Sequence, residues 1–249
     1  MNTVKLEELN EKSFVEGKYD KAILTLGATE SHGPHLPFGT DLYTPYDIAL
    51  DVAKELGNTF VIPPMWYGMS IHYQHKPMSI TLSLETLSKL IYEVLESLHR
   101  WNVKKVLIIN GHDGNIPCIE TAVRNMKAKY PDMNMAWIGA WWAKVKALIP
   151  EGTLEVWDGL GHGGEGETSI TMATVPHLCN LEHAVGMIPE MDPVVDLVWN
   201  FEDITDYGAS GAPKKATMEK GQIMKKALTE YFIDFVKRMD KQGWRYKSS

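Results

Sequence analysis

Cysteine and long apolar stretches are the features that this sequence has least of. Its 249 residues include two cysteines, Cys118 and Cys179, which form neither a C-x-x-C pair nor a recognisable zinc spacing. A disulfide framework is therefore not expected, whereas a reducing compartment is. No run of about eighteen consecutive apolar residues offers a membrane span, and the polar N-terminus lacks the apolar core of a signal peptide. We expect a soluble cytoplasmic protein without a membrane partner.

Positive charge is also scarce. The 25 lysines and arginines are outnumbered by 32 aspartates and glutamates, which gives a formal net charge of −7. Because no basic cluster is long enough to override this balance, nucleic acid is not an expected partner. The hydrophobic content of 44% allows a sizeable core. The length suits one α/β domain over residues 1–249.

Apolar runs of strand length alternate with segments of helical periodicity. This alternation predicts a mainly parallel sheet flanked by helices, with ligands bound beyond the carboxyl ends of the strands. Thr44 is the expected cap of the first long helix, with Pro45 at its first position. The last helix is expected to bury Ile223, Ala227, Tyr231, Phe232 and Phe235. The expected strands lie in 21–27, 59–64, 104–110 and 133–142, and the expected helices are 44–56, 84–101, 117–129 and 220–242.

The stretch TLGATESHGPHLPFGTD, residues 25–41, gathers carboxylates and imidazoles after the first strand. Glu30 and His32 are two positions apart in an extended segment, so their side chains face the same way. Asp41 follows ahead of a helix, and these three side chains can converge on a divalent cation. An isolated Glu-x-His pair favours a structured turn over a metal site, so the metal interpretation depends on residues elsewhere.

Two further motifs supply such residues. The segment NGHDGN, residues 110–115, follows the strand KKVLIIN, so His112 is expected at the same sheet edge, with Asn115 as a donor for an anion or oxyanion. The segment GLGHGGEGETS, residues 159–169, offers His162, Glu165 and Glu167 at the start of a helix. Glu167 suits a metal site or a simple interaction with the helix dipole. Neither a phosphate-binding loop nor a G-x-S-x-G nucleophile motif is present.

Together these motifs, with the later segment GASGAPKKATMEKG, resemble the creatininase (creatinine amidohydrolase) family over nearly the whole chain. The resemblance implies a three-layer α/β/α fold and a site for two divalent metal ions, commonly zinc or manganese, with iron as a further candidate. It also implies hydrolysis of cyclic or linear amide-like bonds. Relatives include formamidopyrimidine deformylases, a peptide-trimming enzyme of mycofactocin maturation and a ring-opening hydrolase of diketo-inositols. Homo-oligomers, often hexamers, are implied as well.

The resemblance also assigns residue roles. Glu30 and His112 resemble the terminal ligands of one metal, His32 resembles that of the second, and Asp41 resembles the carboxylate that bridges both. Creatininase has a glutamate two positions after the histidine that matches His112, and this chain has Gly114 there. The second metal then needs another ligand, and creatinine is placed in doubt as the substrate.

Glu167 is the first choice for this replacement ligand and Asp113 the next, and both are candidate catalytic groups. His162 is the candidate for stabilising the tetrahedral intermediate or for carrying a proton to the leaving group. If the second site is incomplete, a mononuclear centre follows instead. A non-catalytic metal-binding protein is the alternative of another class.

The expected substrate contacts come from the loop at residues 66–78 and from nearby tryptophans. Polar contacts are expected from Tyr67, His72, Tyr73, His75 and Lys76. Lys76 stands in a segment where relatives read FPGTIS, which favours a more polar or anionic substrate. The expected walls of the pocket are Trp141, Trp142 and Trp157. The same loop could instead pack against a neighbouring subunit, since interfaces are rich in Tyr, Trp and Met.

The predicted function is therefore metal-dependent hydrolysis. Two divalent ions lower the pKa of a bridging water, and the resulting hydroxide attacks the carbonyl of a small cyclic or linear amide-type substrate. Ring opening of a cyclic diketone or lactone, such as a diketo-inositol, and deformylation of a formamide are the alternative reactions.

Overall fold

A parallel sheet in the order β2-β1-β3-β4 runs through the middle of the computed structural model, which describes residues 3–192, 194–195 and 197–246. The strands are β1 (Lys21–Leu26), β2 (Thr59–Val61), β3 (Lys105–Asn110) and β4 (Asn134–Ile138). The α-helices are α1 (Glu11–Gly17), α2 (Thr40–Leu56), α3 (Leu84–Arg100), α4 (Ile116–Lys129), α5 (Trp141–Lys144), α6 (Glu165–Thr174) and α7 (Met218–Lys241). The predicted parallel α/β architecture is confirmed.

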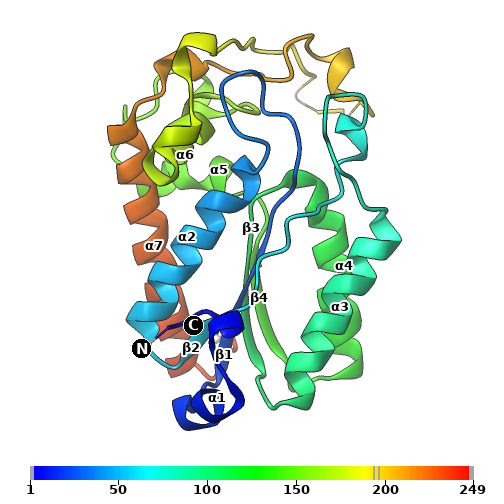
Figure 1. Ribbon diagram of the computed structural model, residues 1–249, viewed down its shortest axis with the longest axis vertical. Helices are drawn as coiled ribbons and strands as arrows, with labels where there is room; N and C mark the ends of the chain where they lie inside the picture. The colour runs from blue at the N-terminus through cyan, green and yellow to red at the C-terminus, as the bar shows by residue number, and fades with distance from the viewer. Residues whose placement is uncertain (1–2, 193, 196, 247–249) are drawn as a thin grey trace.

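Helices cover both faces of this sheet, so the molecule has three layers (Figure 1). Alternate residues of β1 point to opposite faces: Leu24 packs with side chains of α3 and α4, whereas Ile23 packs with side chains of α2 and α7. Burial on both faces explains why the strands are continuous apolar runs rather than alternating ones. Within the described residues, no helix is long and apolar enough to cross a membrane.

Helix α2 begins four residues earlier than its sequence pattern predicts. It starts at Thr40 after Gly39, so Thr44 and Pro45 lie buried inside the helix rather than at its first turn. Pro45 has no N–H to donate to the carbonyl of Asp41 four residues before it. Gly111 approaches this carbonyl so closely that a Cβ atom at position 111 would overlap the oxygen. The proline and the glycine together allow α2 to carry Asp41 up against the end of β3.

Helix α7 is rotated relative to the predicted inner face. Phe232 is buried as expected, but Tyr231 is 40% exposed, and Ile223, Ala227 and Phe235 are only partly buried. The periodicity of the sequence is ambiguous here because apolar side chains surround much of the helix. Close packing on α6 selects the face that includes Gly221. The buried residues of α7 are Gly221, Met224, Leu228, Phe232, Val236 and Met239.

This packing predicts an unusual response to the substitution Gly221→Ala. Alanine is a better helix former than glycine by about 1 kcal/mol, so propensity alone would stabilise the protein. A Cβ atom at position 221 would overlap the backbone carbonyl of Ser169 in α6, however. We therefore expect the free energy of unfolding to fall by about 1–3 kcal/mol, as overpacking of a core does. Urea unfolding would measure it.

The exposed neighbour Gln222 provides the control. Gln222→Ala should change the free energy of unfolding by less than about 0.5 kcal/mol, because the side chain faces solvent. A Gly221→Ala protein as stable as the wild type would contradict the close packing of α6 on α7.

Candidate metal centre

Five side chains with metal-ligating atoms meet beyond the carboxyl ends of β1 and β3. Glu30 and His32 come from the segment after β1, His112 from the segment after β3, Asp41 from the first turn of α2 and Glu167 from the first turn of α6. Glu30 and His32 are 0% exposed, and His112 and Asp41 are 3% and 4% exposed. The structure thus brings together side chains from all three motifs.

Their ligand atoms form two groups that share Asp41. In the first group, His112 Nδ1 lies 3.3 Å from Glu30 Oε1 and 3.1 Å from Asp41 Oδ2. In the second, His32 Nε2 lies 2.8 Å from Asp41 Oδ1 and 3.6 Å from Glu167 Oε2. Each group contains three side chains whose ligand atoms lie within 4.8 Å of one another. The two oxygens of Asp41 therefore face different groups.

Backbone carbonyls fix the orientation of the two histidines. His32 Nδ1 donates to the carbonyl of Glu30 at 3.2 Å, and His112 Nε2 donates to that of Met69 at 3.0 Å. The other ring nitrogen of each histidine therefore faces the carboxylates. A carbonyl that fixes the tautomer in this way is typical of histidines that bind metals.

The carboxylates of these groups stabilise positive charge on the neighbouring histidines. Burial lowers the pKa of His32, but Asp41 and Glu167 offset this effect and hold the pKa well above its ordinary value. His112 behaves alike: burial lowers its pKa, and Glu30 and Asp41 raise it well above the usual range. Burial would raise the pKa of Asp41, yet His32 and His112 hold it below the ordinary value. Metal binding to histidine replaces such protons with the cation.

Unpaired buried oxygens test the fit to a metal. Both carboxylate oxygens of Glu30 and Oδ2 of Asp41 are enclosed and accept no hydrogen bond from the described residues. Buried charges without partners are unfavourable, and such groups in proteins are paired or bind metals. Carboxylate oxygens and imidazole nitrogens also suit zinc and manganese. The residues present therefore fit divalent cations.

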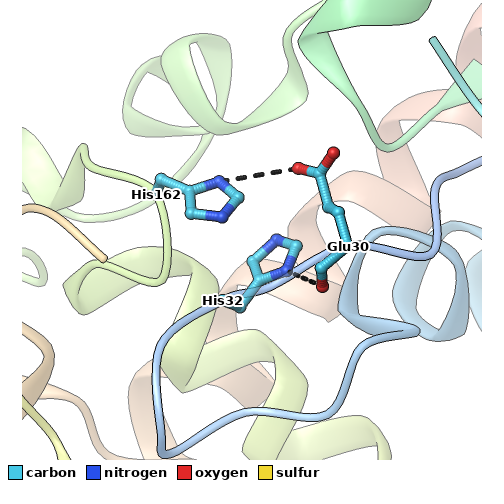
Figure 2. Close-up of side chains that lie close together, drawn as sticks. All are labelled: Glu30, His32 and His162. Atoms are coloured by element: carbon cyan, nitrogen blue, oxygen red, sulfur yellow. Dashed lines mark hydrogen bonds and ion pairs between the residues drawn. The ribbon is translucent and has the colours of Figure 1, made fainter. Parts of the chain in front are cut away.

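His162 faces the same groups from the loop before α6 (Figure 2). Its Nε2 donates to the carbonyl of Ser31 at 2.6 Å, which leaves Nδ1 without a proton, 3.9 Å from Glu30 Oε1. Its ring stacks on that of His32 with 3.9 Å between the centroids. Burial, and then the neighbouring His32, lower the pKa of His162 well below its usual value. His162 is thus a neutral acceptor next to the ligand groups.

The motif around His112 agrees with expectation at Gly114 and differs from it at Asp113 and Asn115. A Cβ atom at Gly114 would overlap the carbonyl of Met69, so a glutamate does not fit there in this conformation. Asp113 is exposed, lines a cavity and belongs to none of the ligand groups found in the described part of the chain. Asn115 donates to the carbonyl of Gly27 at 3.0 Å and so serves the loops rather than an oxyanion.

A cavity of about 290 Å³ opens over the ligand groups. Glu30, Asp41 and Glu167 line its floor, with Asp113 as a fourth carboxylate. Among the residues that the structure describes, no lysine or arginine lines it. The cavity therefore combines an acidic floor with an apolar wall, whose aromatic residues are Tyr73, Trp142, Trp157, Trp199 and Phe201.

The expected substrate contacts are only partly found at this cavity. His72 and Trp157 line it. Lys76 instead donates to the carbonyls of Thr205 and Asp206, at 3.4 and 3.2 Å, so its ammonium group joins two loops. His75 is exposed, with Nε2 3.8 Å from Glu202 Oε1. Neither Lys76 nor His75 lines the cavity. Lys76 therefore does not support the prediction of an anionic substrate.

The tryptophan pair at 141–142 is divided between core and cavity. Trp141 is 4% exposed and packs in the core against the sheet face that α2 and α7 cover, whereas Trp142 lines the cavity. Tyr73, an expected polar contact of its loop, also lines the cavity. Trp199 and Phe201 were not assigned from the sequence, because they lie in a segment without periodicity.

Comparisons with known proteins show which family this chain is similar to. The sequence model of the family described as creatinine amidohydrolase matches residues 7–236. The chain is 27% identical to the creatinine amidohydrolase of Pseudomonas putida over 231 residues, covering 86% of this chain and 88% of that protein. It is 29% identical to the 3-dehydro-scyllo-inosose hydrolase of Thermotoga maritima over 243 residues, covering 88% and 76%.

Solved structures agree as well. A creatininase structure described as the Mn form superposes with a TM-score of 0.80 at 25% identity, and a mutant creatininase described as the Zn-Zn type superposes with 0.80 at 26%. Both alignments cover 95% of this chain and 98% of the other.

The shared position of Asp41 predicts how metal content responds to substitution. Asp41→Ala should lower the content of both metals, because both groups lose a ligand, whereas Glu167→Gln should lower only the content at the His32 group. Elemental analysis after dialysis against metal-free buffer would measure this. Asp113→Asn is the matched control and should keep the wild-type content. An Asp41→Ala protein with full metal content would defeat the assignment.

Proposed function

This chain belongs to the creatininase family of metal-dependent hydrolases, and we propose that it cleaves a small, uncharged amide-type substrate with two divalent metal ions, zinc or manganese. The observation that carries this proposal is the pair of ligand groups that share Asp41. Glu30, His112 and Asp41 would hold one ion, and His32, Asp41 and Glu167 the other. Such a pair of cations, when bound, supplies an acidified water and polarises a carbonyl oxygen.

His162 is the proposed proton carrier of the reaction. Its Nε2–H is engaged by the carbonyl of Ser31, so only Nδ1 can exchange a proton in the cavity. A neutral imidazole with a free Nδ1 can accept the proton of the attacking water and then deliver it to the leaving nitrogen. The stacked ring of His32 and the tilted ring of Tyr73 keep the imidazole in this orientation, with centroid distances of 3.9 and 4.5 Å.

Tyr73 is proposed as a hydrogen-bond donor to the substrate. Its side chain is 3% exposed, and its hydroxyl makes no hydrogen bond to the described residues. This hydroxyl is not fully enclosed by protein atoms, so it is open to the cavity that Tyr73 lines. Burial, and then Glu30 and the other carboxylates, raise the pKa of Tyr73 well above its ordinary value, which keeps the phenol protonated. A protonated phenol can stabilise charge that develops on a carbonyl oxygen.

The walls of the cavity favour an uncharged substrate. The two proposed cations would offset the carboxylates of the floor, the walls are aromatic, and the lining within the described residues holds no lysine or arginine for an anion. One relative is a deformylase whose named substrate is a 5'-monophosphate, and this lining does not favour that class. The Thermotoga relative acts on an inosose, which is uncharged, so ring opening of a cyclic ketone or diketone is the second candidate reaction.

We also propose that the chain is one catalytic domain that acts in the cytoplasm as a homo-oligomer, with a hexamer as the first expectation. Its free cysteines, Cys118 and Cys179, suit a reducing compartment. Val194, Leu197 and Val198 are 86%, 80% and 98% exposed, and apolar side chains exposed together favour an interface. Light scattering on the purified protein would measure the assembly.

Activity of the metal-replete enzyme tests the function directly. We expect hydrolysis of at least one compound from a panel of creatinine, formamides, lactones and cyclic 1,3-diketones. Dialysis against a chelator should abolish the activity, and zinc or manganese should restore it. A preparation with full metal content that hydrolyses none of the panel compounds would contradict the proposed substrate class.

The substitution Tyr73→Phe tests the proposed donor. It removes one oxygen atom and keeps the ring that stacks on His162, so we expect kcat to fall about ten- to a hundredfold with little change in KM or metal content. Tyr67→Phe is the control, because Tyr67 lies on the same loop with 52% of its surface exposed. Unchanged kcat in the Tyr73→Phe enzyme would remove Tyr73 from the mechanism.

A further inference from the structure

Glu165 is a fully buried carboxylate that the proposed mechanism does not use. It is the first residue of α6 and is 0% exposed. Its oxygens accept hydrogen bonds from the backbone N–H of Glu155 at 3.0 and 3.1 Å, and Oε2 accepts one from the N–H of Val156 at 2.8 Å. The carboxylate therefore holds the backbone of the loop that leads into Trp157.

Lys220 from α7 completes the hydrogen bonds around this carboxylate. Its ammonium group lies 2.7 Å from Glu165 Oε1, 2.6 Å from Glu155 Oε1 and 2.9 Å from the carbonyl of Lys215. These three acceptors match the three donors of an ammonium group, and the side chain is only 13% exposed. A loop, α6 and α7 are thereby joined at one buried ion pair.

The turn that follows is held in an unfavourable backbone conformation. Trp157 and Asp158 have φ values of 49° and 53°, in the left-handed region that residues other than glycine rarely adopt. Such residues persist only where the surrounding structure determines their conformation. The hydrogen bonds from Glu155 and Val156 to Glu165 come directly before this turn, and Trp157 itself lines the cavity.

Helix α6 connects this turn to the metal centre. Side chains two positions apart on an α-helix point to nearly opposite sides. Glu165 accordingly faces the loop before Trp157, while Glu167 approaches His32 at 3.6 Å. The first turn of α6 thus fixes a candidate metal ligand on one side and a wall of the cavity on the other.

We propose that Glu165, together with Lys220, is a positioning residue that sets Trp157 at a fixed distance from the metal centre and so determines how tightly the cavity holds its substrate. Its role in substrate binding rests on the proposed function. Glu165 touches neither the ligand groups nor the cavity, so it acts through Trp157.

Steady-state kinetics separate this role from a general loss of stability. Glu165→Gln keeps the size of the side chain and removes its charge, and we expect KM to rise about tenfold, with kcat within about threefold and metal content unchanged. The assay would use the panel compound that the wild type hydrolyses fastest. In a Trp157→Ala background, the same substitution should leave KM unchanged, because the residue through which it acts is gone. Additive effects of the two substitutions would overturn the proposal.

A second measurement does not depend on activity. The acrylamide quenching of Trp157, obtained as the difference between each protein and its Trp157→Phe counterpart, should increase in Glu165→Gln because the turn is no longer held. Quenching equal to that of the wild type would overturn the positioning role even if no panel compound is hydrolysed. If quenching increases in Glu165→Gln as expected but the wild type hydrolyses no panel compound, the positioning role is supported and the proposed substrate class is wrong.

Matched variants complete the design. Lys146→Met breaks the exposed ion pair of Lys146 with Asp158, 2.6 Å long, on the solvent side of the same turn. Both side chains are more than half exposed, so we expect neither KM nor quenching to change. Lys220→Gln keeps a donor that faces Glu165 and should show a smaller version of both effects. If Glu165→Gln and Lys220→Gln both fail to fold, the pair is a folding element and the proposal is wrong.

Discussion

A single buried carboxylate, that of Asp41, is the group on which the rest of the site depends. It lies between two imidazoles that reach it from the ends of neighbouring strands, and further carboxylates approach from both sides. So much negative charge away from water is stable only when positive charge lies among it. The surrounding loops can therefore be understood as the framework that holds this group, since Pro45 and Gly111 allow α2 to place Asp41 directly beside the end of β3.

The clustering of the candidate ligands was predictable because it depends on regularities that operate over short distances. A buried parallel strand ends where its apolar run ends, and side chains two positions apart in an extended segment face the same way. These two rules place Glu30, His32 and His112 at one edge of the sheet. The start of α2 was not predictable, because a proline normally marks the first turn of a helix. Here Gly111 packs against the carbonyl of Asp41, which Pro45 leaves without its helical hydrogen bond.

Which side chains face the cavity could not be read from the sequence, because this depends on contacts between distant segments. Lys76 lies in the loop that was expected to contact the substrate, yet its ammonium group donates to the carbonyls of Thr205 and Asp206 outside the cavity. Trp141 and Trp142 are adjacent and differ only in the direction that a short helix gives them. The choice of Glu167 as a candidate ligand came from the resemblance to creatininase, whereas the lack of room for a side chain at Gly114 became visible only with the backbone of Met69 in place.

The close approach of Gly114 to the carbonyl of Met69 has an evolutionary consequence. A chain of this kind cannot regain the glutamate of creatininase by one substitution, because any side chain at position 114 meets the backbone of another loop. The loop after β2 would have to move first, and only then would the glutamate be tolerated. The effect of a substitution at position 114 therefore depends on the course of this loop, which is epistasis between a position beside the candidate ligands and a loop.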